Sequence, residues 1–203
     1  MNTTELREAF LTDNLMQDDT IQLLYTHYDR VIMGGVKPVG KKLTLGTHSE
    51  LKADFFLQRR ELGIINVGGA GRVWADGQSQ EMNKLDAYYV GKGVKEVSFE
   101  SSDASEPALF YLLSAPAHAV YPAQYLPKEK ALSTEMGSLE TANARTVYKY
   151  IHAEGIQSCQ LVMGLTILKT GSVWNTMPAH THTRRMEAYF YFDVPAGQRV
   201  FHF

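Results

Sequence analysis

Short runs of β-branched and aromatic residues recur along this chain, and most of them stop at glycine. Between two of these runs stands Asp76-Gly77, a dipeptide that is typical of a hairpin turn. The runs occupy residues 20–33, 41–45, 63–67, 72–75, 86–90, 94–99, 108–114, 157–168 and 187–192. Many short strands separated by glycine-rich turns predict an all-β fold, in the form of a sandwich or a barrel.

Charge and cysteine content exclude several classes of protein. Lysine and arginine number 20 against 22 aspartates and glutamates, and the net charge of −2 gives no sign of a nucleic-acid partner. No apolar run approaches the length of a membrane span, and the charged first residues do not resemble a signal peptide. The single cysteine, Cys159, excludes an internal disulfide framework. We therefore expect a cytoplasmic protein that binds neither nucleic acid nor a membrane.

The two halves of the chain resemble each other at an offset of 126 residues. In residues 59–73, and again in 184–200, arginines and an acid precede an apolar stretch, a glycine turn and a further arginine. Two hairpins of similar composition would give the same likeness, but the shared order of charge, strand and turn favours a duplication. We predict a first unit over residues 1–115, a connector over 116–145 and the start of a second unit over 146–203.

The second half carries a motif that the first half lacks, His180-x-His182-x4-Glu187. The offset places Asp54 and Phe56 where these histidines stand, so we expect any metal in the second unit only. Residues i and i+2 of an extended strand point to the same face, and a short turn lets Glu187 face the two imidazoles. This donor set suits zinc, iron, manganese or nickel. The alternative is a pair of surface histidines beside an arginine-rich turn.

Aromatic residues follow Glu187 with alternating parity. Tyr189 and Tyr191 share the parity of Glu187, whereas Phe190 and Phe192 have the opposite one. The tyrosines are therefore expected to line the same cavity as the metal, with the phenylalanines packed outside it. The alternative is that all four rings belong to a hydrophobic core.

Two arginines, Arg184 and Arg185, lie beside the predicted ligands. A guanidinium group binds a carboxylate through two parallel hydrogen bonds, so either arginine is a candidate for holding an acidic substrate, with Arg185 preferred. A solvated pair in a turn is the alternative. Tyr189 or a protonated histidine is a candidate for relaying a proton, but no residue is assigned as the catalytic base.

Three long motifs resemble one family over essentially the whole chain. They occupy residues 55–71, 86–93 and 174–192. The chain resembles the 5-keto-4-deoxyuronate isomerases, also called 4-deoxy-L-threo-5-hexosulose-uronate ketol-isomerases, of the cupin superfamily. The resemblance implies two cupin-like, jelly-roll units, with metal only in the second. It also implies a homo-hexamer that isomerises an acidic sugar of pectin breakdown to 3-deoxy-D-glycero-2,5-hexodiulosonate.

The resemblance implies one zinc ion held by His180, His182, Glu187 and a fourth ligand, a histidine near the C-terminus. No residue matches this fourth ligand, because His202 stands elsewhere in the family pattern. The first unit has its corresponding segment near Glu96, and the offset of 126 moves that point to position 222. We therefore expect the fourth ligand beyond residue 203 and a second unit that is incomplete at its C-terminus.

Two other functions remain open on the same residues. The first is a cupin oxygenase that uses iron at the two-histidine, one-glutamate site. The second is a cupin that binds a sugar without catalysis. Within the isomerase hypothesis, proton transfer through an enediol and a hydride shift are both compatible with the sequence.

Overall fold

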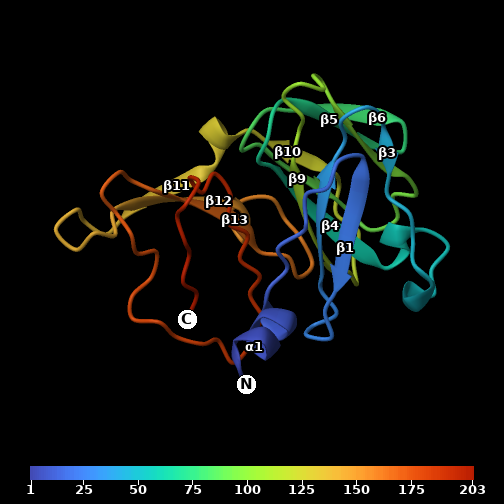
Figure 1. The fold of residues 1–203 in the computed structure, drawn as a ribbon. Coiled ribbons are helices and arrows are strands. Elements are labelled where there is room, and N and C mark those ends of the chain that lie inside the picture. Colours follow the sequence, from blue (N-terminus) through green and yellow to red (C-terminus); the bar gives the residue numbers. More distant parts are fainter.

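The computed structural model describes residues 1–203 and contains two β units that lie side by side (Figure 1). One short helix, α1 (Thr3–Phe10), precedes them, and three short 3-10 helices lie in the loops: η1 (Ser49–Leu51), η2 (Phe56–Gln58) and η3 (Lys128–Lys130). The strands are β1 (Thr20–Tyr25), β2 (Ile32–Lys37), β3 (Leu43–Thr44), β4 (Arg60–Asn66), β5 (Gly71–Ala75), β6 (Gln78–Met82), β7 (Ala87–Val90), β8 (Val97–Ser101), β9 (Phe110–Pro116), β10 (Gln124–Leu126), β11 (Leu132–Met136), β12 (Arg145–Ile151) and β13 (Met163–Leu168). The predicted all-β fold is confirmed.

The first unit is a jelly roll made of two antiparallel sheets. One sheet has the order β1-β2-β9-β4-β7-β10, and the other has the order β3-β8-β5-β6. Early and late strands pair with each other, as β2 does with β9 and β3 does with β8, which is the pattern of interlocked Greek keys. The predicted turn between β5 and β6 has positive φ at both central residues, 46° at Asp76 and 82° at Gly77, as a type I′ hairpin requires.

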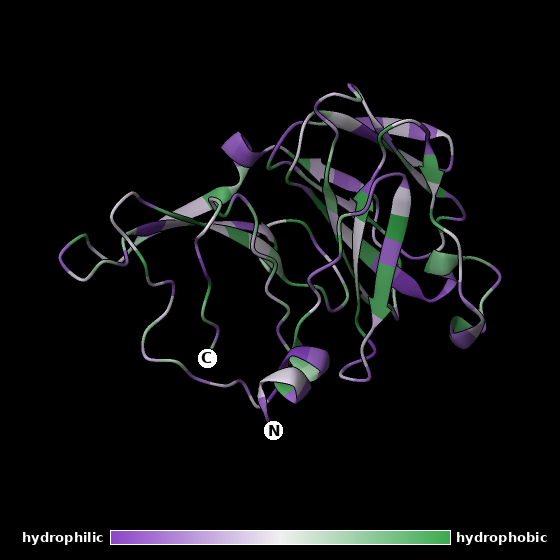
Figure 2. Cartoon of the chain, in the orientation of Figure 1, coloured by the Kyte–Doolittle hydropathy of each residue, from purple (hydrophilic) through white to green (hydrophobic).

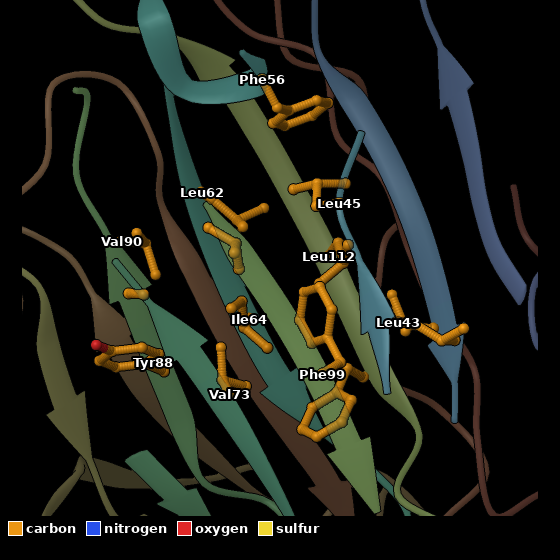
Figure 3. Close-up of a cluster of buried hydrophobic side chains, with 14 of the residues drawn as sticks. Leu43, Leu45, Phe56, Leu62, Ile64, Val73, Tyr88, Val90, Phe99 and Leu112 are labelled. Carbon is orange, nitrogen blue, oxygen red and sulfur yellow. The ribbon is translucent and has the colours of Figure 1, made fainter. Parts of the chain in front are cut away.

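Side chains from both sheets fill the space inside this jelly roll. Figure 3 shows Leu62 and Ile64 of β4 and Leu112 of β9 facing Val73 and Phe99 of the smaller sheet. All five are at most 1% exposed. The inside of the first unit is therefore a hydrophobic core, made of residues with the period-two pattern of strands buried on one face.

The second unit packs against the outer face of the larger sheet. Its three strands form an antiparallel sheet with the order β11-β12-β13. Tyr150 and Ile151 of β12 and Met163 of β13 join Tyr89 and Tyr111 of the first unit in a second hydrophobic cluster. Figure 2 shows polar and apolar residues alternating along several strands, as expected where one face of a strand is covered more than the other.

Some segments differ from the sequence-based expectations. The stretch predicted as a connector, 116–145, contributes β10 to the first unit and β11 to the second. The predicted strand over 157–168 is regular only from Met163, and the predicted strand over 187–192 has no strand pairing. Backbone pairing needs a neighbouring strand, which an alternating sequence alone does not provide. No helix has both the length and the apolar character needed to cross a membrane.

Candidate metal and substrate site

The candidate site lies on an extended segment, residues 186–193, which we call the Glu187 segment. Side chains along it alternate between half-buried and exposed: Met186, Ala188, Phe190 and Phe192 are half-buried, whereas the residues between them are exposed. The half-buried aromatic rings pack against the hydrophobic cluster that joins the two units. The predicted separation of Tyr189 and Tyr191 from the phenylalanines is therefore present although no strand forms.

The two histidines of the motif lie close together before this segment. Their ring centroids are 5.0 Å apart, with the ring planes at 80°. The Nδ1 atom of His180 lies 3.0 Å from the carbonyl oxygen of Pro178. When Nδ1 carries the proton, that bond leaves the Nε2 lone pair of His180 free to bind a metal, as in many histidine ligands.

The Glu187 carboxylate is the centre of the polar contacts. Its Oε1 atom lies 3.1 Å from Nε2 of His182 and accepts two hydrogen bonds from Arg185, of 3.1 Å from Nε and 2.8 Å from a terminal nitrogen. Its Oε2 atom accepts a 2.8 Å hydrogen bond from the hydroxyl of Tyr189. The carboxylate is thus held from both sides while its side chain stays 29% exposed.

These contacts change the pKa values of Glu187 and Tyr189. Partial burial raises the pKa of Glu187, but hydrogen bonds from Tyr189 and Arg185 and the charge interaction with His182 outweigh it, so the pKa is lowered. Burial, together with the hydrogen bond to Glu187, raises the pKa of Tyr189 to about 12. At neutral pH the pair is therefore a carboxylate and a neutral phenol that donates to it.

The donor chemistry fits zinc, although the side chains do not form a ligand shell. The three predicted ligands are neighbours, and His180 presents a free Nε2 atom when its proton is on Nδ1. However, no group of three histidine, cysteine, aspartate or glutamate side chains in the structure is placed to hold a metal ion. The Arg185 guanidinium takes the role of the cation at Oε1 of Glu187. The metal-ligand assignment therefore stays a prediction.

The two arginines differ in their surroundings. Arg185 is engaged with Glu187, whereas Arg184 is exposed and takes no part in an ion pair. Farther along, the hydroxyl of Tyr191 lies 2.8 Å from Nδ1 of His202, and the ring of His202 meets that of Tyr189 edge-on at 4.8 Å. His202 is thus close to the tyrosines, a contact that the sequence did not predict, because it lies eleven positions after Tyr191.

Glu61, the counterpart of Glu187 in the first half, has a different environment. It is fully buried in β4, and its carboxylate accepts hydrogen bonds from the Tyr89 hydroxyl and from the backbone N–H groups of Cys159, Gln160 and Leu161, at 2.7 to 2.9 Å. These bonds connect the first unit to the loop that precedes β13. The sequence repeat singled out Glu61, but nothing in it indicated this connection between the units.

The comparisons with known proteins agree with the resemblance in the sequence. The model of the KduI/IolB family matches residues 11–203. A 4-deoxy-L-threo-5-hexosulose-uronate ketol-isomerase of Formosa agariphila is 58% identical over 202 residues, which is 100% of this chain and 72% of that protein. One with the same name from Halalkalibacterium halodurans is 52% identical over 99% of this chain and 73% of its own.

A solved structure is also similar, at a much greater distance. An IolB-like protein of Salmonella typhimurium has 17% sequence identity and a TM-score of 0.48, over 66% of this chain and 50% of that one. The match to the family model and the identity to these relatives show that the chain belongs to the KduI/IolB family.

Proposed function

We propose that this chain is a zinc-dependent ketol-isomerase that converts 4-deoxy-L-threo-5-hexosulose uronate into 3-deoxy-D-glycero-2,5-hexodiulosonate. The observation that carries the proposal is the 58% identity, over the whole chain, to a protein named for this ketol-isomerase activity. The cluster of His180, His182 and Glu187 supports the zinc dependence through its donor chemistry. The family resemblance further supports a homo-hexamer in the cytoplasm that acts in pectin breakdown.

The substrate is an open-chain uronate with an aldehyde at C1, a hydroxyl at C2 and a carboxylate at the far end. A bound zinc ion would supply Lewis-acid polarisation of the C1 and C2 oxygens. His180, His182 and Glu187 are the residues that would hold it. The resemblance also implies a histidine as the fourth ligand.

The two arginines and Tyr189 have separate roles, one in binding the substrate and the others in orienting the carboxylate of Glu187. Arg184, which has no ion pair of its own, is the arginine that the contacts favour for the substrate carboxylate. Arg185 and Tyr189 instead hold the two oxygens of Glu187 and keep it ionised. Tyr189 also presents a phenol beside the site, from which a proton can reach a substrate oxygen.

The test is to incubate the purified chain with zinc and the uronate in deuterated water and follow the product by NMR. We expect isomerisation without oxygen uptake, and the Glu187→Gln variant is the matched inactive control. The aldehyde carbon of the substrate becomes the hydroxymethyl carbon of the product. Deuterium on that hydroxymethyl carbon indicates an enediol route, and its absence indicates a hydride shift. Oxygen consumption without isomerisation would contradict the proposal in favour of an iron oxygenase, and sugar binding without turnover would favour a non-catalytic cupin.

A further inference from the structure

The Glu187 segment contacts the first unit, although no strand pairs with it. It has no backbone pairing with β11, β12 or β13. Its ring stack and the polar contacts at its two ends are with residues of the jelly roll. We therefore expect those contacts to set the position of the segment and to determine which of its side chains face the first unit.

The central contact is a ring stack. The ring of Phe190 lies parallel to that of Tyr111 in β9, with centroids 4.8 Å apart and planes at 4°. Phe192 stacks on Phe190 at 6.1 Å and packs against the same hydrophobic cluster. Tyr111 is only 8% exposed, so it is a buried part of the sheet face on which the segment lies.

Polar contacts hold the two ends of the segment. The backbone N–H of Met186 donates a 3.2 Å hydrogen bond to Asp29, in the turn between β1 and β2. Asp193 forms a 2.7 Å ion pair with Lys84, in the loop between β6 and β7. The segment is thus attached to the first unit immediately before Glu187 and again after Phe192.

These contacts determine which way Glu187 points. Because side chains alternate along an extended chain, burying Phe190 and Phe192 turns Glu187 and Tyr189 outward, and Glu187 then meets His182. A slip of one residue would bury Glu187 against the hydrophobic cluster and expose the phenylalanines. Tyr111 is 76 positions away from Glu187 in the sequence and does not contact it.

We propose that Tyr111 is a positioning residue for the candidate site, and that the jelly roll without a predicted metal is the template that orients Glu187 of the second unit. The proposal rests on the proposed zinc-dependent function only for its effect on metal binding. The docking of the segment itself does not depend on that function.

The test compares Tyr111→Leu, which removes the stack, with Tyr111→Phe, which keeps it and removes only the hydroxyl. Tyr121→Leu is a matched control, because Tyr121 packs against the same cluster without stacking on the segment. Hydrogen exchange of a peptide spanning residues 186–193 reports docking directly. We expect faster exchange there in Tyr111→Leu, exchange close to that of the wild type in Tyr111→Phe, and no change of this peptide in Tyr121→Leu.

Zinc affinity, measured by competition with a chromophoric chelator, reports the positioning. We expect the dissociation constant for zinc to rise about tenfold in Tyr111→Leu, the low end of the effect of removing a support of a metal ligand, and Tyr111→Phe to restore it. In a Glu187→Gln background, Tyr111→Leu should change zinc affinity little, because the residue through which it acts is already altered. Asp29→Gly, at an exposed position with a φ of 52°, removes the acceptor for Met186 without removing a buried ring and without straining the backbone.

The outcomes separate the two proposals. Unchanged exchange of the Glu187 segment in both Tyr111→Leu and Asp29→Gly would overturn the docking role. Faster exchange with unchanged zinc affinity, or equal losses of affinity with and without Glu187, would overturn the positioning role. A third outcome is that the wild-type chain binds no zinc, but the Glu187 segment still exchanges faster in Tyr111→Leu than in the wild type. That result would refute the zinc-dependent function and leave only the docking role of Tyr111.

Discussion

Glu61 and Glu187 stand 126 residues apart, at corresponding points of the two halves, and each accepts a hydrogen bond from a tyrosine. Tyr89 donates to Glu61 at 2.7 Å, and Tyr189 donates to Glu187 at 2.8 Å. Glu61 is fully buried, and its remaining partners are three backbone N–H groups. Glu187 is partly exposed, and its remaining partners are the side chains of Arg185 and His182.

The difference shows how one position in a repeat acquires two uses. Each oxygen of Glu61 accepts two hydrogen bonds from fixed donors, so little capacity is left for a metal or a substrate. The partners of Glu187 are ionisable side chains near solvent, which a ligand is able to displace. Fixed backbone donors make Glu61 a connection between the units, whereas movable donors leave Glu187 free for chemistry.

The largest effect is expected from Glu61→Ala. The substitution leaves the Tyr89 hydroxyl and three backbone N–H groups without their acceptor, and each unpaired buried donor costs about 1–3 kcal/mol. We expect the free energy of unfolding to fall by at least about 3 kcal/mol in urea titrations. Glu154→Ala, on the exposed turn before the same loop, is the control. A loss no larger than that of the control would mean that Glu61 does not connect the units.

Glu187→Gln is expected to lower activity strongly and to change stability little, the reverse of Glu61→Ala. The side chain is 29% exposed, so the free energy of unfolding should change by no more than about 0.5 kcal/mol. Isomerase turnover should fall at least about 100-fold. Removing a residue that supports a metal ligand lowers activity by up to about 100-fold, and removing the ligand itself should cost at least as much. The measurement pairs urea unfolding with the NMR assay. Turnover within threefold of the wild type would remove Glu187 from the site.

Tyr89 and Tyr189, the tyrosines that donate to the two glutamates, allow a comparison in which only one hydrogen bond is removed from each carboxylate. Tyr89→Phe removes a donor to a buried charged group, so we expect a loss of about 1.5–3 kcal/mol in the free energy of unfolding. Tyr189 is 48% exposed, and Tyr189→Phe should cost less than about 0.5 kcal/mol. Differential scanning calorimetry of both variants, with Tyr28→Phe as an exposed control, measures the contrast. Equal losses would show that the two carboxylates have equivalent surroundings.

Much of the first unit could be predicted from the sequence, because its signals are local. Alternating apolar residues and the pair Asp76-Gly77 specify strands and turns without knowledge of their neighbours. The Glu187 segment shows the limit of such patterns. Its alternation correctly predicted that the tyrosines and the phenylalanines face opposite ways. Strand formation, however, depends on a pairing partner that the segment does not have here.

The candidate site was only partly predictable for the same reason. The motif His180-x-His182-x4-Glu187 has local spacing, so its three residues could be named together and are found as neighbours. The contacts of Tyr111 and Asp29 with the segment span 79 and 157 positions of the sequence. Contacts of that separation follow from how the two units pack, and no motif in one sequence encodes them.

The arginines before the two glutamates extend the comparison to substrate binding. Arg60 is buried in β4, where it donates to the hydroxyl and the carbonyl of Ser114 and to the carbonyl of Arg30, and burial lowers its pKa to about 10. Arg59 donates to the carbonyl of Leu51. Both arginines of the first half are thus bound internally, as Glu61 is.

Arg184 has no such partners, and this leads to the smallest of the expected effects. If its guanidinium binds the substrate carboxylate equally in the ground state and the transition state, Arg184→Ala should raise KM about tenfold, or about 1.4 kcal/mol, with kcat unchanged. Arg185→Ala should instead lower kcat, because Arg185 holds Glu187. Initial rates over a range of uronate concentrations separate the two, with the exposed Arg199→Ala as the control. A KM effect confined to Arg185→Ala would reverse the assignment: Arg185 would leave Glu187 to bind the substrate, and the contact between them would belong to the substrate-free state alone.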